Sequence, residues 1–410
     1  MEGCVFLQTG RRSLRRVLIV HNHLAPVGGV EAHVESEIQL LSNAGYDVEV
    51  FAISASPAWK HRQKTTVYWQ HPPSWRVRRI LAYGFDPRLA FKLRQTVRRF
   101  RPDWIHLHTV EQPLTIFTAL AGERVLHSVH INALACPLST LYYRDTLEAC
   151  NGQPGWKCAR RTCVHPLSLW LRIAFIRCYR ALINLTGTTC APPNSSLALL
   201  LRQAGVRRVR VLPLFPHRLV SAGDEHTSVR SDNMILFVGA LTDIKAPDLL
   251  INALPLIRES VPTAHIVFVG DGPLRNALVG LADRLGVAKH VRFLGRLDRI
   301  EVENYYRQAA VCVIPSIVAE TFCLVAYEAM LHSCPVVSSN RGALPDIVQD
   351  GHTGLLFDPT DIASLSKAVT EVLTNPRRAK TMAVNARERV VSEFSPKSFL
   401  FRLENILRDV

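Results

Sequence analysis

The second half of the chain alternates short apolar runs with longer amphipathic stretches. The apolar runs cover residues 234–238, 265–269, 291–294, 311–314 and 335–338, and helical spacing covers 246–259 and 275–285. Short apolar runs separated by helices are typical of parallel strands that are buried on both faces. The pattern therefore predicts an α/β domain built on a doubly wound parallel sheet.

A less regular alternation fills the first half. Strand-like runs cover residues 17–21, 47–53, 102–108, 124–129 and 207–214, and helical spacing covers 30–44, 86–100 and 166–183. Another helix begins near residue 195, with Asn194 or Ser195 as its N-cap, because either side chain can accept a hydrogen bond from a first-turn amide. The polar run at 221–233 is predicted to be a linker.

Two acidic residues frame the junction between the strand at 311–314 and the next helix. Glu320 lies in the loop and Glu328 lies inside the helix. Open α/β sheets bind ligands at the carboxyl ends of their strands, and the free amides of a first helical turn favour a phosphate. A nucleotide sugar suits this arrangement. The alternative is a loop residue and a helix-surface charge with no joint role.

Three glycines and one lysine fall at the same edge of the predicted sheet, where its strands end. Gly239, Gly270 and Gly272 follow two strands, which opens the edge to a nucleotide. Lys245, six residues after Gly239, could point its ammonium group into the crevice and neutralise phosphate charge.

The first half carries its own candidates. Gly28 and Gly29 precede a helix, where they are either turn residues or a close approach for a ligand. His106, His108 and His130 fall at the ends of two strands, so we expect them on one rim, either handling substrate or acting structurally.

Length and composition narrow the class of protein. A chain of 410 residues predicts two domains, and 48% hydrophobic with 20% charged residues is typical of a folded globular enzyme. No apolar run approaches the roughly 20 residues that span a bilayer, so we expect a cytosolic chain.

The positive charge lies in the first half. Residues 1–220 hold 29 Lys and Arg against 12 Asp and Glu, a net +17, whereas residues 221–410 hold 20 against 22, a net −2. This predicts a surface for phospholipid head groups or a lipid-phosphate-linked substrate; nucleic acid is not expected, since no recognition motif accompanies the charge. Arg172, Arg177 and Arg180 fall within an arc of about 140° on one helix, either facing an anionic membrane or forming an exposed basic edge.

The segment 136–163 holds four of the ten cysteines. Cys136, Cys150, Cys158 and Cys163 have irregular spacing and little periodicity around them. In a reducing compartment a disulfide framework is not expected, so they form either a structural metal clip or free thiols.

In order along the chain, these motifs resemble the retaining, GT-B-fold sugar transferases of glycosyltransferase family 4. The resemblance covers nearly the whole chain. It rests on Pro-Val-Gly-Gly-Val-Glu at 26–31, Pro-Asp-Trp-Ile-His-Leu-His at 102–108, Val-His at 129–130, Phe-Val-Gly at 237–239 with Lys245, Gly-Asp-Gly-Pro-Leu-Arg at 270–275, the stretch 319–330, and Gly-Ala-Leu-Pro-Asp at 342–346.

The resemblance implies two facing Rossmann-like domains with a cleft between them: an acceptor domain at 1–218 with a cysteine-rich insertion at 136–163, a donor domain at 219–394, and a final helix at 395–410 that returns to the first domain. It also implies roles for individual residues. Glu320 would contact the donor sugar, Lys245 the diphosphate and Glu328 the ribose. The amides of Cys323, Leu324 and Val325 would bind the diphosphate together with Gly239, His130 would line the reaction centre, and Gly28 and Gly29 would border the phosphates or the acceptor.

Three positions depart from the family's pattern. Ala240 stands where an Arg usually supplies a second diphosphate cation, and Ala246 and Cys323 stand where glycines are usual. We expect the missing Arg to weaken donor binding by about 1.5–3 kcal/mol, unless another Arg, such as Arg341, replaces it. Cys323 is expected to narrow the space over the phosphate.

The sequence thus predicts a retaining glycosyltransferase that moves a sugar from a nucleotide-diphosphate sugar to a glycan or lipid-linked acceptor in cell-surface polysaccharide or glycolipid synthesis. No cofactor is expected beyond the donor, and no catalytic metal, since the chain has no Asp-x-Asp motif. We expect a cytoplasmic protein, peripheral at the inner face of the membrane. The alternatives are a degenerate scaffold and another GT-B enzyme, such as an epimerase or phosphorylase.

Overall fold

The computed structural model describes residues 15–24, 29–56, 64–69, 84–143, 146, 148–150, 152–161, 163–216 and 233–409. Chain contacts divide into a first unit, residues 1–128 with 185–189, and a second unit, residues 129–184 with 190–410. The predicted linker lies outside the described residues except for Asn233. The domain boundaries at 218 and 394 stay predictions.

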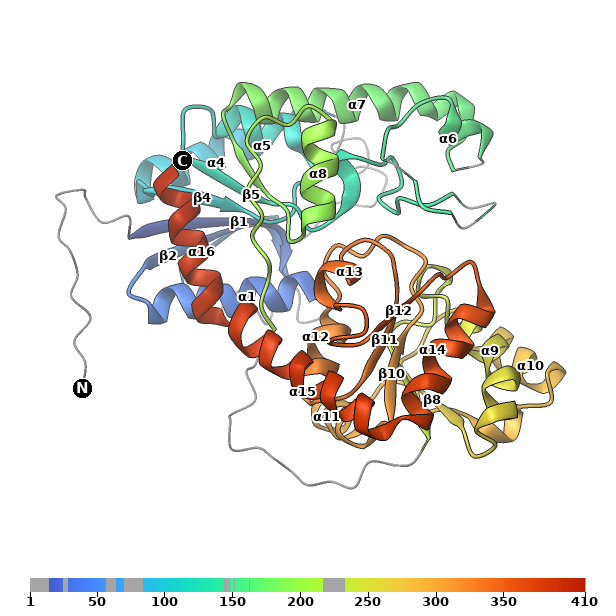
Figure 1. The fold of residues 1–410 in the computed structure, drawn as a ribbon. Helices are drawn as coiled ribbons and strands as arrows, with labels where there is room; N and C mark the ends of the chain where they lie inside the picture. Colours follow the sequence, from blue (N-terminus) through green and yellow to red (C-terminus); the bar gives the residue numbers. More distant parts are fainter. Residues whose placement is uncertain are drawn as a thin grey trace, which may run out of the picture. The chain divides into compact units, whose positions relative to one another are not determined.

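The first sheet has six strands in the order β3-β2-β1-β4-β5-β6. Figure 1 labels its central strands β2, β1, β4 and β5. From its central strand β1 the chain fills one side and then the other, which is the order of a Rossmann sheet. The strands are β1 (Arg16–Leu24), β2 (Asp47–Ala55), β3 (Thr65–Trp69), β4 (Trp104–Leu107), β5 (Val125–Ser128) and β6 (Thr189–Ala191).

Helices in the first half begin at caps that the sequence supplies. The Asp86 carboxylate accepts hydrogen bonds from the amides of Arg88 and Leu89, at 3.0 and 3.1 Å, and so starts α4. Asn194 does the same for α8 by accepting from the amide of Leu197 at 2.7 Å. The helices are α1 (Gly29–Asn43), α4 (Pro87–Phe100), α5 (Pro113–Ala119), η1 (Asn132–Leu134), α6 (Lys157–Arg160), α7 (Pro166–Leu185) and α8 (Ser195–Gln203).

The second sheet repeats the order, as β12-β11-β10-β7-β8-β9. Alternate residues of its strands enter two cores: Val311 and Val313 pack with the helices α9, α10 and α14, whereas Cys312 and Ile314 pack with α11, α12 and α13. The strands are β7 (Met234–Val238), β8 (His265–Val269), β9 (Val291–Phe293), β10 (Val311–Ile314), β11 (Val336–Ser339) and β12 (Leu355–Phe357). The prediction of an α/β fold with doubly wound parallel sheets is confirmed.

Helices cover both faces of this second sheet (Figure 1). The last helix of the chain, α16, contributes to neither of these two cores and packs Phe399 against Phe215, with ring centroids 4.9 Å apart. The helices are η2 (Asp243–Lys245), α9 (Pro247–Ser260), α10 (Arg275–Arg284), η3 (Ala288–His290), α11 (Arg299–Gln308), α12 (Leu324–Leu331), α13 (Leu344–Ile347), α14 (Ile362–Thr374), α15 (Pro376–Glu393) and α16 (Pro396–Asp409).

The strand predicted at 207–214 is wrong. Only an isolated parallel bridge between Cys190 and Val209 forms, with hydrogen bonds from the amides of Arg210 and Leu212 to the carbonyls of Cys190 and Pro192. Its neighbour β6 has three residues and ends before two prolines, so a longer ladder has no regular partner.

The cysteine-rich segment contains little regular structure. It holds the short helix α6 and an isolated antiparallel bridge between Tyr142 and Ala149. No disulfide joins cysteines within the described residues. Burial raises the pKa of the Cys158 thiol, so at neutral pH it is protonated. The choice between a metal clip and free thiols stays open.

Candidate functional site

The switch point of the second sheet lies between β7 and β10, which pair in parallel. Loops that follow two such strands turn to opposite faces and leave a crevice for a ligand. Gly239 directly follows β7, and the loop 315–323 directly follows β10. The predicted donor residues of the second half therefore gather at the position where this fold binds ligands.

Lys245 and Glu320 form an ion pair at this point. The Lys245 Nζ and Glu320 Oε1 atoms are 2.5 Å apart, and the Ser316 hydroxyl donates to the same oxygen at 2.7 Å. Burial opposes the charged ammonium, but the neighbouring Glu320 carboxylate outweighs it and raises the pKa of Lys245. At neutral pH the site therefore holds a fixed ammonium beside a carboxylate that two partners orient.

Gly342 allows the loop after β11 to lie against Glu320. A Cβ atom at Gly342 would be 2.4 Å from both the amide nitrogen and the carbonyl oxygen of Glu320. The Ala343 amide donates to that carbonyl at 2.7 Å, and the Ser339 hydroxyl donates to the carbonyl of Ser316 at 2.6 Å. The backbone on both sides of the Glu320 carboxylate is therefore fixed by the neighbouring strand.

The glycines after β8 serve backbone packing. A Cβ atom at Gly270 would be 1.9 Å from the carbonyl oxygen of Gly239, and one at Gly272 would be 2.4 Å from that of Leu241. These two glycines therefore bring the β8 loop against the β7 loop. A Cβ atom at Gly239 would meet only the Phe237 ring, at 3.7 Å, so space remains over this glycine.

Helix α12 begins directly beside Glu320. Cys323 is its N-cap residue, and Leu324 and Val325, both half-buried, form its first turn. The Cys323 side chain is 4% exposed and packs in the apolar core, and burial raises the pKa of its thiol to about 12. The prediction that Cys323 narrows the space over the first turn is wrong, because its side chain is directed into the core.

Glu328 lies one turn further along α12. The Tyr306 hydroxyl donates to its Oε2 atom at 3.2 Å, and burial raises the pKa of this carboxyl group. Glu328 also lines a small cavity of about 30 Å³ together with Arg299, Glu303 and His332. A partly buried carboxylate with one protein donor retains the capacity to accept further hydrogen bonds from ligand hydroxyls.

Replacing Glu328 with Gln is expected to raise the free energy of unfolding at neutral pH. The folded-state pKa lies above the ordinary value of 4.5, so wild-type stability falls as pH rises through 4.5 and levels off above the folded-state pKa. Gln keeps a partner for Tyr306 and does not titrate, so its advantage grows across that window. Urea unfolding of both proteins at a series of pH values measures the difference. A difference that does not change with pH contradicts it, and Glu259→Gln, at an exposed position, is the control.

A segment from the first half of the sequence lies on the Glu320 loop within the second unit. The Thr321 hydroxyl donates to the His130 carbonyl at 2.6 Å, and the Asn132 side chain donates to the Ala319 carbonyl at 2.9 Å. The Asn194 side chain donates to the Thr321 carbonyl at 2.7 Å. The structure thus brings the backbone of His130 to the Glu320 loop, and the His130 side chain is buried, 6% exposed.

Two family models match the chain. Glycosyltransferase Family 4 matches residues 27–215, and Glycosyl transferases group 1 matches residues 224–389, so that together they cover most of the sequence. This chain is a glycosyltransferase of the family 4 type.

Curated relatives are glycosyltransferases of several specificities. A GDP-mannose-dependent alpha-(1-6)-phosphatidylinositol monomannoside mannosyltransferase of Mycolicibacterium smegmatis is 32% identical over 180 residues, which is 42% of this chain and 47% of that protein. A glycogen synthase of Mycobacterium tuberculosis is 28% identical across 92% of this chain and 91% of its own. The chain thus spans about half the length of the first relative and most of the second.

Solved structures share the fold. Alr3699/HepE of Anabaena, in complex with UDP, has a TM-score of 0.73 at 19% identity and covers 96% of this chain and 100% of its own. Sucrose-phosphate synthase of Thermosynechococcus elongatus has a TM-score of 0.69 at 20% identity, covering 96% and 98%. The predicted GT-B class, with its two Rossmann-like sheets, is confirmed.

Some predicted residues of this glycosyltransferase lie elsewhere. Gly28 is outside the described residues, and Gly29 is exposed at the start of α1 in the first unit. His106 and His108 are 0% and 1% exposed and pair with Glu37, so burial favours the structural one of their two predicted roles over substrate handling. The sequence shows where a strand ends, but it does not show which helix covers that end in the fold.

The replacement of the missing second cation by Arg341 stays a prediction. Ala240 is exposed at the crevice, where the family has an Arg, and the Arg341 guanidinium pairs with Asp358 at 3.7 Å. Ala246 adopts a left-handed backbone with φ 46°, which explains why glycine is usual there. Sequence reasoning also missed Asn132 and the second bond of Asn194, which act through distant backbone partners, and Ser316, whose hydroxyl binds the Glu320 carboxylate four residues away.

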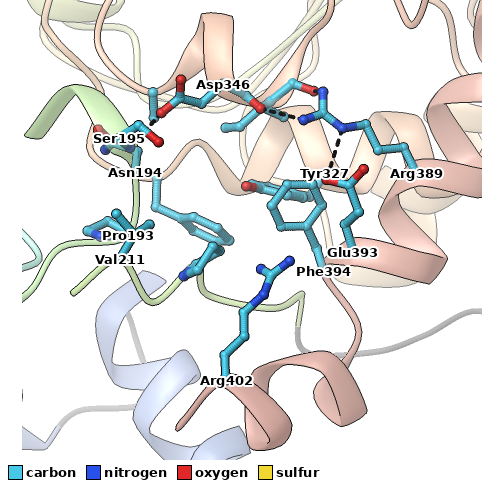
Figure 2. Close-up of a pocket in the computed structure, with 14 residues that line it drawn as sticks. Pro193, Asn194, Ser195, Val211, Tyr327, Asp346, Arg389, Glu393, Phe394 and Arg402 are labelled. Atoms are coloured by element: carbon cyan, nitrogen blue, oxygen red, sulfur yellow. Dashed lines mark hydrogen bonds and ion pairs between the residues drawn. The ribbon is translucent and has the colours of Figure 1, made fainter. Parts of the chain in front are cut away.

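A cavity of about 320 Å³ lies beside the Glu320 loop (Figure 2). Arg389 spans one wall by donating to the carbonyls of Asp346 and Ile347, each at 2.9 Å, and the Ser195 amide donates to the Asp346 carboxylate at 2.7 Å. Phe322 and Arg402 also line it. Neither Lys245 nor Glu320 lines this cavity.

Proposed function

We propose that this glycosyltransferase moves a sugar from a nucleotide-diphosphate sugar to a glycan or lipid-linked acceptor, with retention. The observation that carries the proposal is the Lys245–Glu320 pair beside the first turn of α12, at the switch point of the second sheet. The names of relatives support the donor class, since one is GDP-mannose-dependent and a structural neighbour holds UDP. A relative that is a phosphatidylinositol monomannoside mannosyltransferase supports the acceptor class. Cell-surface polysaccharide or glycolipid synthesis is the expected context.

Each residue takes a separate part in this proposal. Lys245 and the amides of Leu324 and Val325 bind the diphosphate, since an ammonium group and the positive end of a helix both favour an anion. Glu320 contacts the donor sugar and Glu328 accepts hydrogen bonds from the ribose. His130 lines the acceptor side, and Gly239 leaves room for the nucleotide.

The reaction requires stabilisation of an oxocarbenium-like sugar and of a departing diphosphate. Donors fixed before the reaction lower this barrier most, because they need no reorganisation as charge develops. In the proposed reaction the acceptor attacks from the face the leaving group departs from, and the leaving phosphate takes the acceptor proton. No protein nucleophile is assigned, and we expect neither a catalytic metal nor a cofactor.

A donor screen tests this function. Purified protein is incubated with UDP- and GDP-sugars and candidate acceptors, and release of the free nucleotide is measured. We expect release with one donor class that depends on acceptor and is lost in Glu320→Gln. No release with any donor would contradict the proposal, and dependence on free phosphate would favour a phosphorylase.

The exposed Ala240 favours one rival, a degenerate protein that only binds a partner enzyme. Without a cation at this position, Lys245 is the one proposed side-chain cation for the diphosphate. Isothermal titration with nucleotide sugars separates the two functions. Saturable heat supports the enzyme, and its absence with every donor supports the scaffold.

We also propose that α6 and α7 rest on an anionic membrane. Within the described residues, no helix is both long and apolar enough to cross a bilayer. The prediction that Arg172, Arg177 and Arg180 form one exposed basic face is wrong. Arg172 and Arg180 instead donate to the carbonyls of Pro137 and Leu134, at 3.0 and 2.7 Å. Exposed aromatic and basic side chains on the two packed helices support the proposal instead. They are Trp156, Lys157, Arg160, Trp170, Leu171 and Arg177.

Sedimentation with liposomes tests this membrane contact. We expect binding to vesicles with anionic lipid, weakening with salt because each basic residue near the surface contributes about 1 kcal/mol. The double change Trp170→Ser and Leu171→Ser should reduce it severalfold, whereas Phe401→Ser, at an equally exposed position on α16, should not. Indifference to lipid charge would remove the proposal.

A further inference from the structure

Four side chains of the first unit form a buried polar cluster. His33 and Glu37 come from α1, and His106 and His108 come from β4 and the residue after its end. All four are at most 1% exposed. None belongs to the transfer site in the second unit.

The cluster is centred on the Glu37 carboxylate. Its Oε1 atom is 2.6 Å from His106 Nδ1, and its Oε2 atom is 3.3 Å from His108 Nε2 and 3.6 Å from His33 Nε2. The rings of His106 and His108 have centroids 4.3 Å apart. Ligand atoms of Glu37, His106 and His108 all lie within 4.8 Å of one another.

We propose that Glu37, His106 and His108 bind a divalent transition metal, with Zn²⁺ as the expected ion. Two imidazoles and one carboxylate are a common donor set for zinc. With bonds of about 2.0–2.1 Å, tetrahedral ligand atoms are roughly 3.3 Å apart, which is the spacing of Glu37 Oε2 and His108 Nε2. The 2.6 Å hydrogen bond between His106 Nδ1 and Glu37 Oε1 must open when the metal binds. His33 is the nearest candidate for a fourth ligand.

The surroundings of His106 support a ligand role. Its Nε2 atom bonds the Ser128 hydroxyl at 2.8 Å, which leaves Nδ1 directed at the cluster. Metal-binding histidines usually have their second nitrogen held in this way, because the bond fixes the tautomer and the ring. Both His106 and Ser128 lie on strands, so the geometry is rigid.

Charge also favours a cation. A buried carboxylate is costly unless an opposite charge compensates it. In the described part of the chain, every side-chain partner of Glu37 is an imidazole, with no Lys or Arg among them. A bound divalent ion compensates the carboxylate and joins α1 to β4. Since the site is closed to solvent, its role is structural.

Cobalt spectroscopy on the full chain tests the site without relying on any variant. Metal-free protein is titrated with Co²⁺. We expect tetrahedral d–d bands without thiolate-to-cobalt charge transfer, since all ligands are nitrogen or oxygen. Charge transfer alone would place the metal on the cysteines and overturn the proposal, as would no spectrum at all.

Metal content then identifies the ligands. Wild-type protein supplied with Zn²⁺ should retain one ion, and Glu37→Gln and His108→Gln should lose it. The zinc content of each folded protein is measured by inductively coupled plasma mass spectrometry. The exposed His352→Gln is the control and should retain it. Zn²⁺ should also raise the thermal midpoint of wild type but not of Glu37→Gln. Equal retention by all variants, or none by wild type, would mean that the cluster is a hydrogen-bonded network only.

Discussion

Replacing Glu320 with Gln, or Lys245 with Ala, is expected to cut sugar transfer at least about tenfold while the protein stays folded. Removal of one preorganised group that stabilises developing charge commonly costs more than this. Lys245→Ala deletes the proposed side-chain cation at the diphosphate, and Glu320→Gln deletes the charge that holds Lys245 2.5 Å away. Initial rates of nucleotide release, with donor concentration varied, measure both.

The two variants should differ in their kinetics. Lys245→Ala removes binding to the diphosphate of the bound donor, which raises KM, and to the additional charge that develops on it in the transition state, which lowers kcat. Glu320→Gln keeps a hydrogen-bond acceptor for Ser316 and should act mainly on kcat.

A surface ion pair provides the matched control. Glu371 pairs with Arg378 in the same unit, away from the switch point, and Glu371→Gln should leave transfer unchanged because exposed pairs contribute little. Circular dichroism checks that each variant is folded. Near-normal transfer by both site variants would remove the assignment of this site.

Much of the second sheet could be predicted because its strands are buried on both faces. β7, β8 and β10 have the predicted bounds, since each is a continuous apolar run that begins or ends at Gly, Pro or a polar turn. The segment 207–214 looked similar, but pairing needs a partner of matching length and β6 is too short. An apolar run shows that a segment is buried; it does not show that a neighbour completes the ladder.

The candidate site was predictable where a residue type alone carries the chemistry. Glu320 and Lys245 were expected at one edge from strand ends and from the family's pattern, and the structure adds their direct contact. Asn132 acts through a backbone partner that only the folded chain brings near. Ser316 binds Glu320 within the same loop, but the sequence does not show which way the two side chains point.

The predictions for the basic helix and for the histidines were incomplete for a related reason. Helical spacing placed Arg172 and Arg180 on one side of α7, but that side meets the carbonyls of residues 134 and 137. Strand spacing placed His106 and His108 together, but Glu37, 69 residues away from His106, determines what they do there. Periodicity gives the face of an element and leaves its partner unknown.

Gly342→Ala is expected to lower the free energy of unfolding by about 2–5 kcal/mol and to abolish most transfer. Its φ of 57° costs a residue with a side chain about 1–2 kcal/mol, and overpacking adds about 1–3 kcal/mol. The added Cβ atom would lie 2.4 Å from the backbone of Glu320 and 2.5 Å from the Ala319 carbonyl carbon, so the loop must move. Moving it separates the Glu320 carboxylate from Lys245.

Gly351→Ala separates these two causes. Gly351 has a similar φ of 72°, but a Cβ atom there would meet only the end of the Arg378 side chain, at 3.6 Å. It should therefore lose about 1–2 kcal/mol from backbone strain and keep its transfer activity. Urea unfolding and nucleotide release on both variants give the comparison. If the two variants lose equal stability and equal activity, the close approach of Gly342 to Glu320 does not position the carboxylate, and the site must be held by its side-chain bonds to Ser316 and Lys245 alone.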